Sequence, residues 1–105
     1  QTRIVAARTS GRVESVSMMR PMSALSRTLR RGMRGEDVTL LQQALTANGV
    51  YAEEATGFFG KLTEAAVIRF QEKYAEEILK PAGLSRGSGL VGAGTRKKIN
   101  SIIAQ

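Results

Sequence analysis

The feature that most constrains this chain is a short motif that occurs twice, at residues 57–63 and again at residues 89–95. Both copies read Gly-x-apolar-Gly-x-x-Thr, and the agreement continues past the threonine at helical spacing. One supersecondary unit is therefore built twice around a shared core. The six matching pairs are Gly57/Gly89, Phe59/Val91, Gly60/Gly92, Thr63/Thr95, Val67/Ile99 and Phe70/Ile102.

The physical chemistry of the motif predicts which side chains point inward. Two glycines allow a tight turn with positive φ on either side of one apolar residue. We expect that residue, Phe59 or Val91, to be buried as a plug, which leaves its neighbour, Phe58 or Leu90, more exposed. The threonine lies near a helix start, where we expect its hydroxyl to meet an unpaired backbone N–H.

Three helices are predicted from the spacing of apolar residues. The first begins at Glu36-Asp37, where acids favour the helix dipole, and ends at Asn48-Gly49. The second runs over residues 61–79 and is stopped by Pro81, and the third runs over residues 94–103. The core faces combine Val38, Leu41 and Leu45 with Leu62, Ala66, Val67, Phe70, Tyr74 and Ile78, and with Ile99, Ile102 and Ile103.

The fold class that follows is all-α, a three-helix bundle with an internal helix-turn repeat. We assign residues 29–105 to this domain and residues 1–28 to a basic N-terminal arm or linker. Poorly alternating β-branched residues around Thr9-Ser10-Gly11 leave the arm either extended or folded as a short hairpin. A chain of 105 residues is too short for two well-buried cores.

The positive charge is concentrated in the first third of the chain. Residues 1–35 hold eight arginines and one acid, whereas the basic and acidic residues of 36–105 balance. Guanidinium groups pair with carboxylates and phosphates, so such an arm suits an anionic polymer, a protein partner, acidic lipid or nucleic acid. Charge alone names no partner, and a solvated linker explains it equally well.

The absence of histidine and cysteine excludes several classes of site. No serine or cysteine triad, thiolate metal site or disulfide can form, and we expect no metal and no cofactor. The acidic doublets Glu53-Glu54 and Glu76-Glu77 point apart rather than across a cleft, unlike the carboxylates of a glycosidase. We therefore expect a module that is not an enzyme.

Taken together, the motifs resemble the three-helix type of bacterial peptidoglycan-binding domain. The resemblance covers residues 29–103, in three blocks that occur in the family's order. The first block is Leu29, Gly32, Gly35, Val38, Leu41, Gln42 and Leu45; the second is Gly57, Phe59, Gly60, Thr63, Ala66, Val67, Phe70 and Gln71; the third is Gly89, Val91, Gly92 and Thr95.

The chain also departs from that family pattern. Thr56 and Ser88 stand where the family often has aspartate, although either hydroxyl can still close its turn. The segment 76–88 is longer than the usual link between the second and third helices. For Gln42 and Gln71 we expect a structural role, in which each hydrogen-bonds turn backbone and holds helix ends together.

The resemblance implies a shallow groove near the two turns that receives glycan or stem peptide. Tyr51 and Phe58 would offer apolar faces, and Leu90 lies at the mouth of the second turn. Arg86 and Arg96 would meet carboxylates of the peptide stem. For each of these five residues an ordinary surface role is the competing interpretation.

The function implied is a non-catalytic module that anchors or targets an attached protein to the cell wall, with peptidoglycan as partner. The alternative is a protein-interaction or assembly module of a bacterial envelope complex that keeps the fold without binding glycan. Nucleic-acid binding through the arm ranks third, because the arm lacks interleaved aromatic residues. No run of apolar residues is long enough to span a membrane, and we expect an extracytoplasmic location, in the envelope or secreted.

Overall fold

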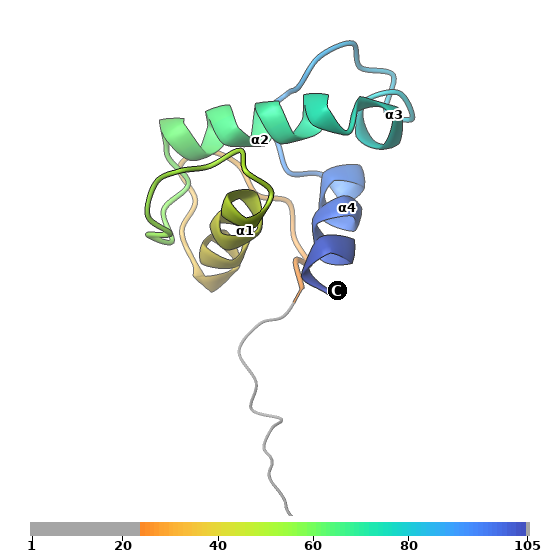
Figure 1. Cartoon of the computed structure of the whole chain (residues 1–105). Coiled ribbons are helices and arrows are strands. Elements are labelled where there is room, and N and C mark those ends of the chain that lie inside the picture. Colours follow the sequence, from red (N-terminus) through yellow and green to blue (C-terminus); the bar gives the residue numbers. More distant parts are fainter. Residues whose placement is uncertain (1–23, 105) are drawn as a thin grey trace, which may run out of the picture.

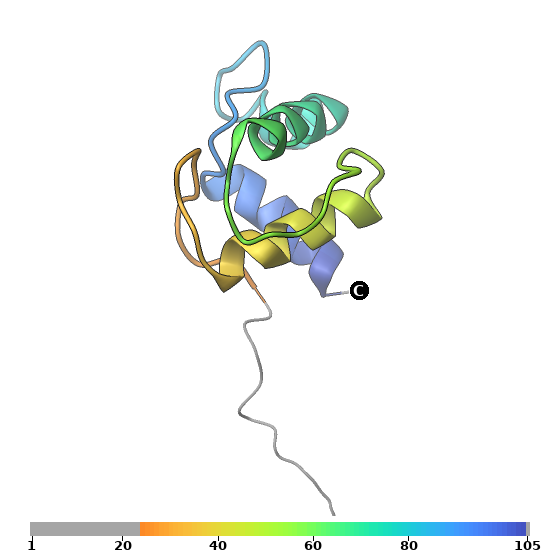
Figure 2. The same cartoon turned by 90° about the vertical axis from the view of Figure 1, so that its left-hand side faces the viewer.

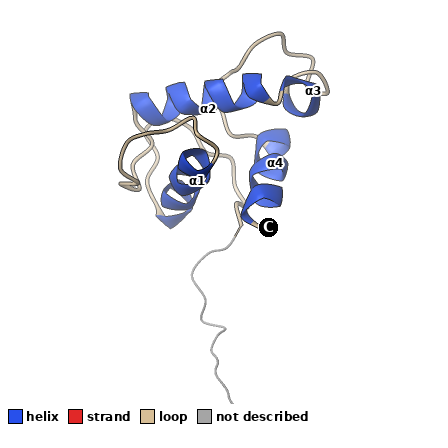
Figure 3. Ribbon diagram, viewed as in Figure 1, coloured by secondary structure: helices blue, strands red, loops and turns tan. Residues whose placement is uncertain are grey.

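The computed structural model describes residues 24–104 as a helical domain (Figure 1). Its helices are α1 (Glu36–Ala47), α2 (Lys61–Lys73), the single turn α3 (Ala75–Ile78) and α4 (Ala93–Ile103). Within the described part of the chain there are no named strands, only two isolated bridges, and Figure 3 shows helices joined by loops. The all-α, three-helix prediction is confirmed, and the predicted hairpin lies outside the described residues.

The three long helices surround one aliphatic core. Helix α2 lies across α1 and α4, and the view turned by 90° in Figure 2 shows the same crossing. Both predicted plugs, Phe59 and Val91, are completely buried, whereas Phe58 and Leu90 are 38% and 43% exposed. The other core residues are Leu25, Leu29, Val38, Leu41, Ala44, Leu45, Tyr51, Ala66, Val67, Phe70, Ile78, Leu79 and Ile99. Of the residues expected on the core faces, Tyr74, Ile102 and Ile103 are only partly buried, and Leu62 is wrongly predicted, since it is 57% exposed.

The second helix ends earlier than its sequence pattern predicts. A helix over 61–79 was expected, but the backbone leaves the helical region at Tyr74 (φ −113°, ψ 42°), and α3 turns away towards α4. The Tyr74 ring packs against Phe70 at 5.0 Å and carries the Lys98 ammonium 4.4 Å from its centroid. The break keeps Ile78 and Leu79 buried in the core.

Two details of the turn motif were predicted wrongly. Only the first glycine of each turn has positive φ (Gly57 +84°, Gly89 +82°), whereas Gly60 and Gly92 are extended and cap the following helix. Neither helix has a side-chain cap. Thr63 is the third residue of its helix, already inside the first turn, and its hydroxyl pairs with a glutamine side chain instead of the backbone.

Residues before Leu29 pack against the domain. Leu25 is buried, and its backbone N–H and C=O bond to the Asn100 side chain at 2.7 and 3.0 Å. Arg96 donates to the Thr28 hydroxyl at 2.9 Å. The chain therefore enters the domain beside the last turns of α4, at the end away from the second turn motif (Figure 1).

Candidate binding site

A fully buried glutamine side chain organises the first turn (residues 57–60). The Gln42 amide donates to the Phe58 carbonyl at 3.0 Å and to the Thr63 hydroxyl at 2.9 Å, and its oxygen accepts the Gly57 N–H at 2.9 Å. The Tyr51 hydroxyl lies 3.5 Å from the Gln42 nitrogen. Since buried polar groups must be satisfied, this arrangement ties α1, the turn and α2 together.

Gln71 repeats this arrangement at the second turn (residues 89–92). Its amide donates to the Leu90 carbonyl at 2.9 Å and to the Thr95 hydroxyl at 3.1 Å. Its oxygen accepts two backbone N–H groups, from Ser88 at 2.8 Å and Gly89 at 3.0 Å. The structural role expected for both glutamines is confirmed.

Two hydroxyl side chains also close the turns. Thr56 accepts the Phe58 N–H at 3.2 Å, and Ser88 accepts the Leu90 N–H at 3.1 Å. Each bond spans two residues and fixes the backbone just before the outward-facing side chain. The position of Phe58 and Leu90 is therefore set by the turn itself and by the glutamine behind it.

A segment that we call the strap, residues 29–34, joins the two turns. Leu29 and Val91 exchange backbone bonds of 3.2 and 2.8 Å at the second turn. At the first turn, Gly32 donates to Phe59 at 2.8 Å and Phe59 donates to Met33 at 2.9 Å. Both turns are thus fixed to one piece of backbone.

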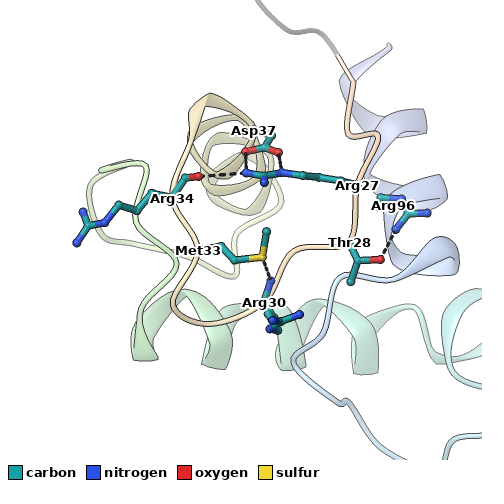
Figure 4. Close-up of polar contacts among 7 residues, drawn as sticks. All are labelled: Arg27, Thr28, Arg30, Met33, Arg34, Asp37 and Arg96. Atoms are coloured by element: carbon teal, nitrogen blue, oxygen red, sulfur yellow. Dashed lines mark hydrogen bonds and ion pairs between the residues drawn. The ribbon is translucent and has the colours of Figure 1, made fainter.

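An ion pair anchors the first-turn end of the strap. The Arg27 guanidinium bonds to both oxygens of Asp37 and also donates to the Arg34 carbonyl at 3.1 Å, as Figure 4 shows. Asp37 is only 4% exposed. The hydrogen bond from Arg27 holds the pKa of the Asp37 carboxyl below its usual range, against the opposing effect of burial, and the same bond raises the pKa of Arg27.

Each turn lies at the edge of an open pocket. The first-turn pocket has a volume of about 530 Å³, and the second-turn pocket about 320 Å³. The first is lined by Tyr51, Glu53, Glu54, Thr56, Phe58, Gly60, Lys61, Leu62 and Thr63. The second is lined by Gln71, Glu77, Ile78, Pro81, Ala82, Leu84, Ser88, Leu90, Gly92, Ala93, Gly94 and Thr95.

The five residues predicted to contact ligand fall into two groups. Three line these pockets: Phe58 and Tyr51 the first, and Leu90 the second. Tyr51 is 7% exposed and its hydroxyl donates to the Glu54 carbonyl at 3.1 Å, so it forms the pocket wall. Arg86 is exposed on the loop after α3 and lines neither pocket. Arg96 is half-buried against Thr28.

The described residues hold no cluster of three or more acids that would suit a metal ion. None of the helices found in residues 24–104 has the length and apolar character that crossing a bilayer requires.

Comparison with known proteins decides the family. The family model described as a peptidoglycan binding domain matches residues 34–77. The crystal structure of the SleB N-terminal domain superposes with a TM-score of 0.62 and 35% identity, over 76% of this chain and 97% of that one. This chain belongs to the peptidoglycan-binding domain family. It is a peptidoglycan-binding module by that membership.

Other relatives carry the same domain within longer proteins. The spore cortex-lytic enzyme of Bacillus cereus is 32% identical over 87 residues, which are 83% of this chain and 30% of the relative. That of Bacillus subtilis is 37% identical over 79 residues, 74% of this chain and 23% of the relative. A peptidoglycan-binding protein from Clostridioides difficile has a TM-score of 0.59 at 32% identity, over 73% of this chain and 42% of that one.

Sequence reasoning missed the basic residues of the strap as candidates. Arg30, Arg31 and Arg34 are exposed, and the Arg34 guanidinium lies 4.6 Å from the centroid of the Phe58 ring. From the sequence, residues 29–34 were placed in the domain, but their arginines were counted together with the positive charge of the N-terminal arm. The isolated bridges Leu29–Val91 and Arg34–Phe58, which place these charges beside both turns, carry no sequence signature.

Proposed function

We propose that this peptidoglycan-binding domain is a non-catalytic module that holds an attached protein on the cell wall, with the ligand seated at the two turn pockets. The observation that carries the proposal is the duplicated turn. In each copy a buried glutamine fixes the backbone so that one apolar side chain, Phe58 or Leu90, stands at the rim of an open pocket.

The first-turn pocket offers the chemistry that a sugar needs. An aromatic ring packs against the C–H face of a pyranose, and carboxylates and hydroxyls bond its hydroxyl groups. Phe58 supplies the ring, and Thr56, Glu53 and Glu54 lie around the pocket. The Arg34 guanidinium over the ring restricts its orientation. We assign glycan contact to this pocket and peptide contact to the second turn.

A binding role without catalysis is supported by the acids of the domain. Glu53 and Glu54 are neighbours on one loop, and Glu76 and Glu77 are paired with Lys80 and Lys98 at 3.1 and 2.9 Å. A glycosidase needs two carboxylates facing each other across the scissile bond. The arrangement of these four glutamates in residues 24–104 therefore favours a binding role over a glycosidase activity.

The position of the attachment points also favours targeting. Leu25 is bonded to Asn100 near the end of α4, and α4, with 11 residues, is roughly 16 Å long. The first and last described residues therefore lie near the end of α4 opposite the second turn. An attached protein would leave the pockets accessible, in an extracytoplasmic setting.

The test is co-sedimentation with purified sacculi freed of teichoic acid. We expect wild-type protein to pellet, and Phe58→Ala and Leu90→Ala each to reduce the bound fraction about threefold to tenfold without loss of helicity, because each removes one exposed apolar contact. Gln43→Ala, on the exposed face of α1, is the matched control and should bind as wild type. Wild-type protein that stays in the supernatant at low salt would overturn the proposal.

The arginine-rich arm is assigned a separate, auxiliary role toward anionic polymer. Residues 1–23 carry Arg3, Arg8, Arg12 and Arg20. Deleting only these residues keeps Leu25 and Arg27, which pack on the domain. In the same assay this variant should bind teichoic-acid-free sacculi as wild type does. On sacculi that retain the polymer, wild type should bind more strongly at low salt than at high salt, and the variant should lack this additional binding.

A further inference from the structure

The strap brings two arginines to the second turn. Arg30 and Arg31 lie where the strap turns, between its bonds to the two turns, and the Met33 N–H donates to the Arg30 carbonyl at 3.1 Å. The Arg30 N–H in turn faces the Met33 sulfur (Figure 4). The backbone that carries both guanidinium groups is thus fixed, although the side chains are exposed.

These arginines line a small pocket of their own, which we call the strap pocket. It has a volume of about 200 Å³ and is lined by Arg30, Arg31, Glu64, Ser88, Gly89 and Leu90. Arg31 makes a long ion pair with Glu64, at 3.4 Å, and the Arg31 side chain is 55% exposed. Within residues 24–104 no carboxylate pairs with Arg30. The pocket therefore carries one positive charge in excess.

We propose that the strap pocket binds a carboxylate of a short acidic peptide, the stem peptide of peptidoglycan, with Arg30 and Arg31 as the specificity-determining residues. Leu90, 43% exposed, contacts the small apolar side chain next to that carboxylate. Guanidinium groups match carboxylates in charge and shape. The inference rests on the proposed function and names the ligand group at its second turn.

The charges around the pocket favour this ligand over two others. A phosphodiester polymer needs a row of cations, but Glu64 stands within the pocket and leaves a single excess charge. A neutral glycan has no charge to pair with the two guanidinium groups and finds its aromatic and hydroxyl partners at the first turn. A single carboxylate beside an alkyl group fits the charge and the apolar wall.

The experiment is an NMR titration of the full chain with a soluble stem tetrapeptide that has free carboxylates, and with the same peptide amidated. We expect Arg30→Gln/Arg31→Gln to weaken binding of the free peptide about tenfold, since each exposed charge contact is worth up to about fivefold. Glu64→Gln should strengthen it about twofold to threefold, because it removes a repelling charge. Amidation of the peptide should mimic the double substitution.

Lys80→Gln/Lys97→Gln is the matched control, since it removes two exposed cations away from the strap and should leave peptide affinity unchanged within about twofold. Equal affinity of the arginine double variant and wild type for the free peptide would overturn the inference. So would a polyglycerol phosphate probe that binds the strap in place of the peptide. Co-sedimentation of wild type with sacculi separates this inference from the proposed function. Wild type can still bind sacculi even if the arginine double variant binds the free peptide as well as wild type does.

Discussion

The first and second turns share one internal structure and have different surfaces. In both, a buried glutamine donates to the carbonyl of the outward residue and to a threonine in the next helix, at distances that agree within 0.2 Å. Outside, the first turn presents an aromatic ring beside two acids, whereas the second presents a leucine beside an apolar loop and two arginines.

This difference teaches which parts of the repeat make the fold and which are left for recognition. The inward residue, the glutamine and the threonine satisfy packing and hydrogen bonding, so a change at any of them leaves a void or an unpaired buried group. A side chain at the first glycine would be strained by its positive φ. The outward residue and the exposed pocket-lining residues, such as Glu53 and Leu84, have no such task. They are where the two copies are able to acquire different ligands.

The largest expected effect is on the two plugs, Phe59 and Val91, and tests whether they contribute equally to the stability of the one core. Phe59→Ala should lower the free energy of unfolding by about 4 kcal/mol, and Val91→Ala by about 2 kcal/mol, because the phenylalanine leaves the larger cavity. Urea denaturation monitored by circular dichroism measures both. Leu62→Ala, on a residue 57% exposed, is the control and should cost under about 0.5 kcal/mol. Equal losses at the two plugs would mean that cavity size does not set the cost.

Removing the glutamines tests whether the two hydrogen-bonding arrangements are equally important. Gln42→Ala and Gln71→Ala should each cost about 2 to 3 kcal/mol, because buried backbone groups lose their partners. We expect the larger loss at Gln71, which accepts two backbone N–H groups where Gln42 accepts one. The Tyr51 hydroxyl near Gln42 also offers a substitute partner. A larger loss in Gln42→Ala would reverse this ranking.

The smallest expected effect is a pH dependence of stability. It tests the Arg27–Asp37 ion pair, which lies at the first-turn end of the strap and has no buried counterpart at the second turn among the described residues. Because the folded-state pKa of Asp37 is lowered, the pair with Arg27 contributes stability fully above the ordinary aspartate value of about 3.9 and loses it as the pH falls through the folded value. Asp37→Asn should therefore melt below wild type at pH 6, and the gap should narrow below pH 4. Thermal melts across this range measure it.

At acid pH the strap keeps its backbone bonds to Val91 at the second turn and to Phe59 at the first, so the loss of stability should be confined to the ion pair. A gap in melting temperature that stays constant from pH 6 to pH 3 would show that Asp37 contributes no titratable stability. Arg69→Gln, which loses a bond from an exposed guanidinium to the Val50 carbonyl, serves as a control whose effect should not change over that range.

Much of the fold could be predicted because the repeat is local. The spacing of Phe59, Thr63 and Val67, and of their partners 32 residues later, defines a turn followed by a helix wherever it occurs. The start and end of α1 followed from Glu36-Asp37 and Gly49, for which the chemistry lies within a few residues. The break at Tyr74 did not follow, because it depends on packing against Phe70 and on Lys98 from another helix.

The sequence by itself determined the fold class, the inward plugs and the outward residues Phe58 and Leu90, since these follow from periodicity and turn chemistry over short distances. Only the tertiary structure decided that Arg30 and Arg31 lie beside Leu90, that Arg96 is held by Thr28, and that Leu25 is bonded to Asn100 of α4. These contacts join residues far apart in the chain. Their formation depends on how the helices pack, which no local pattern encodes.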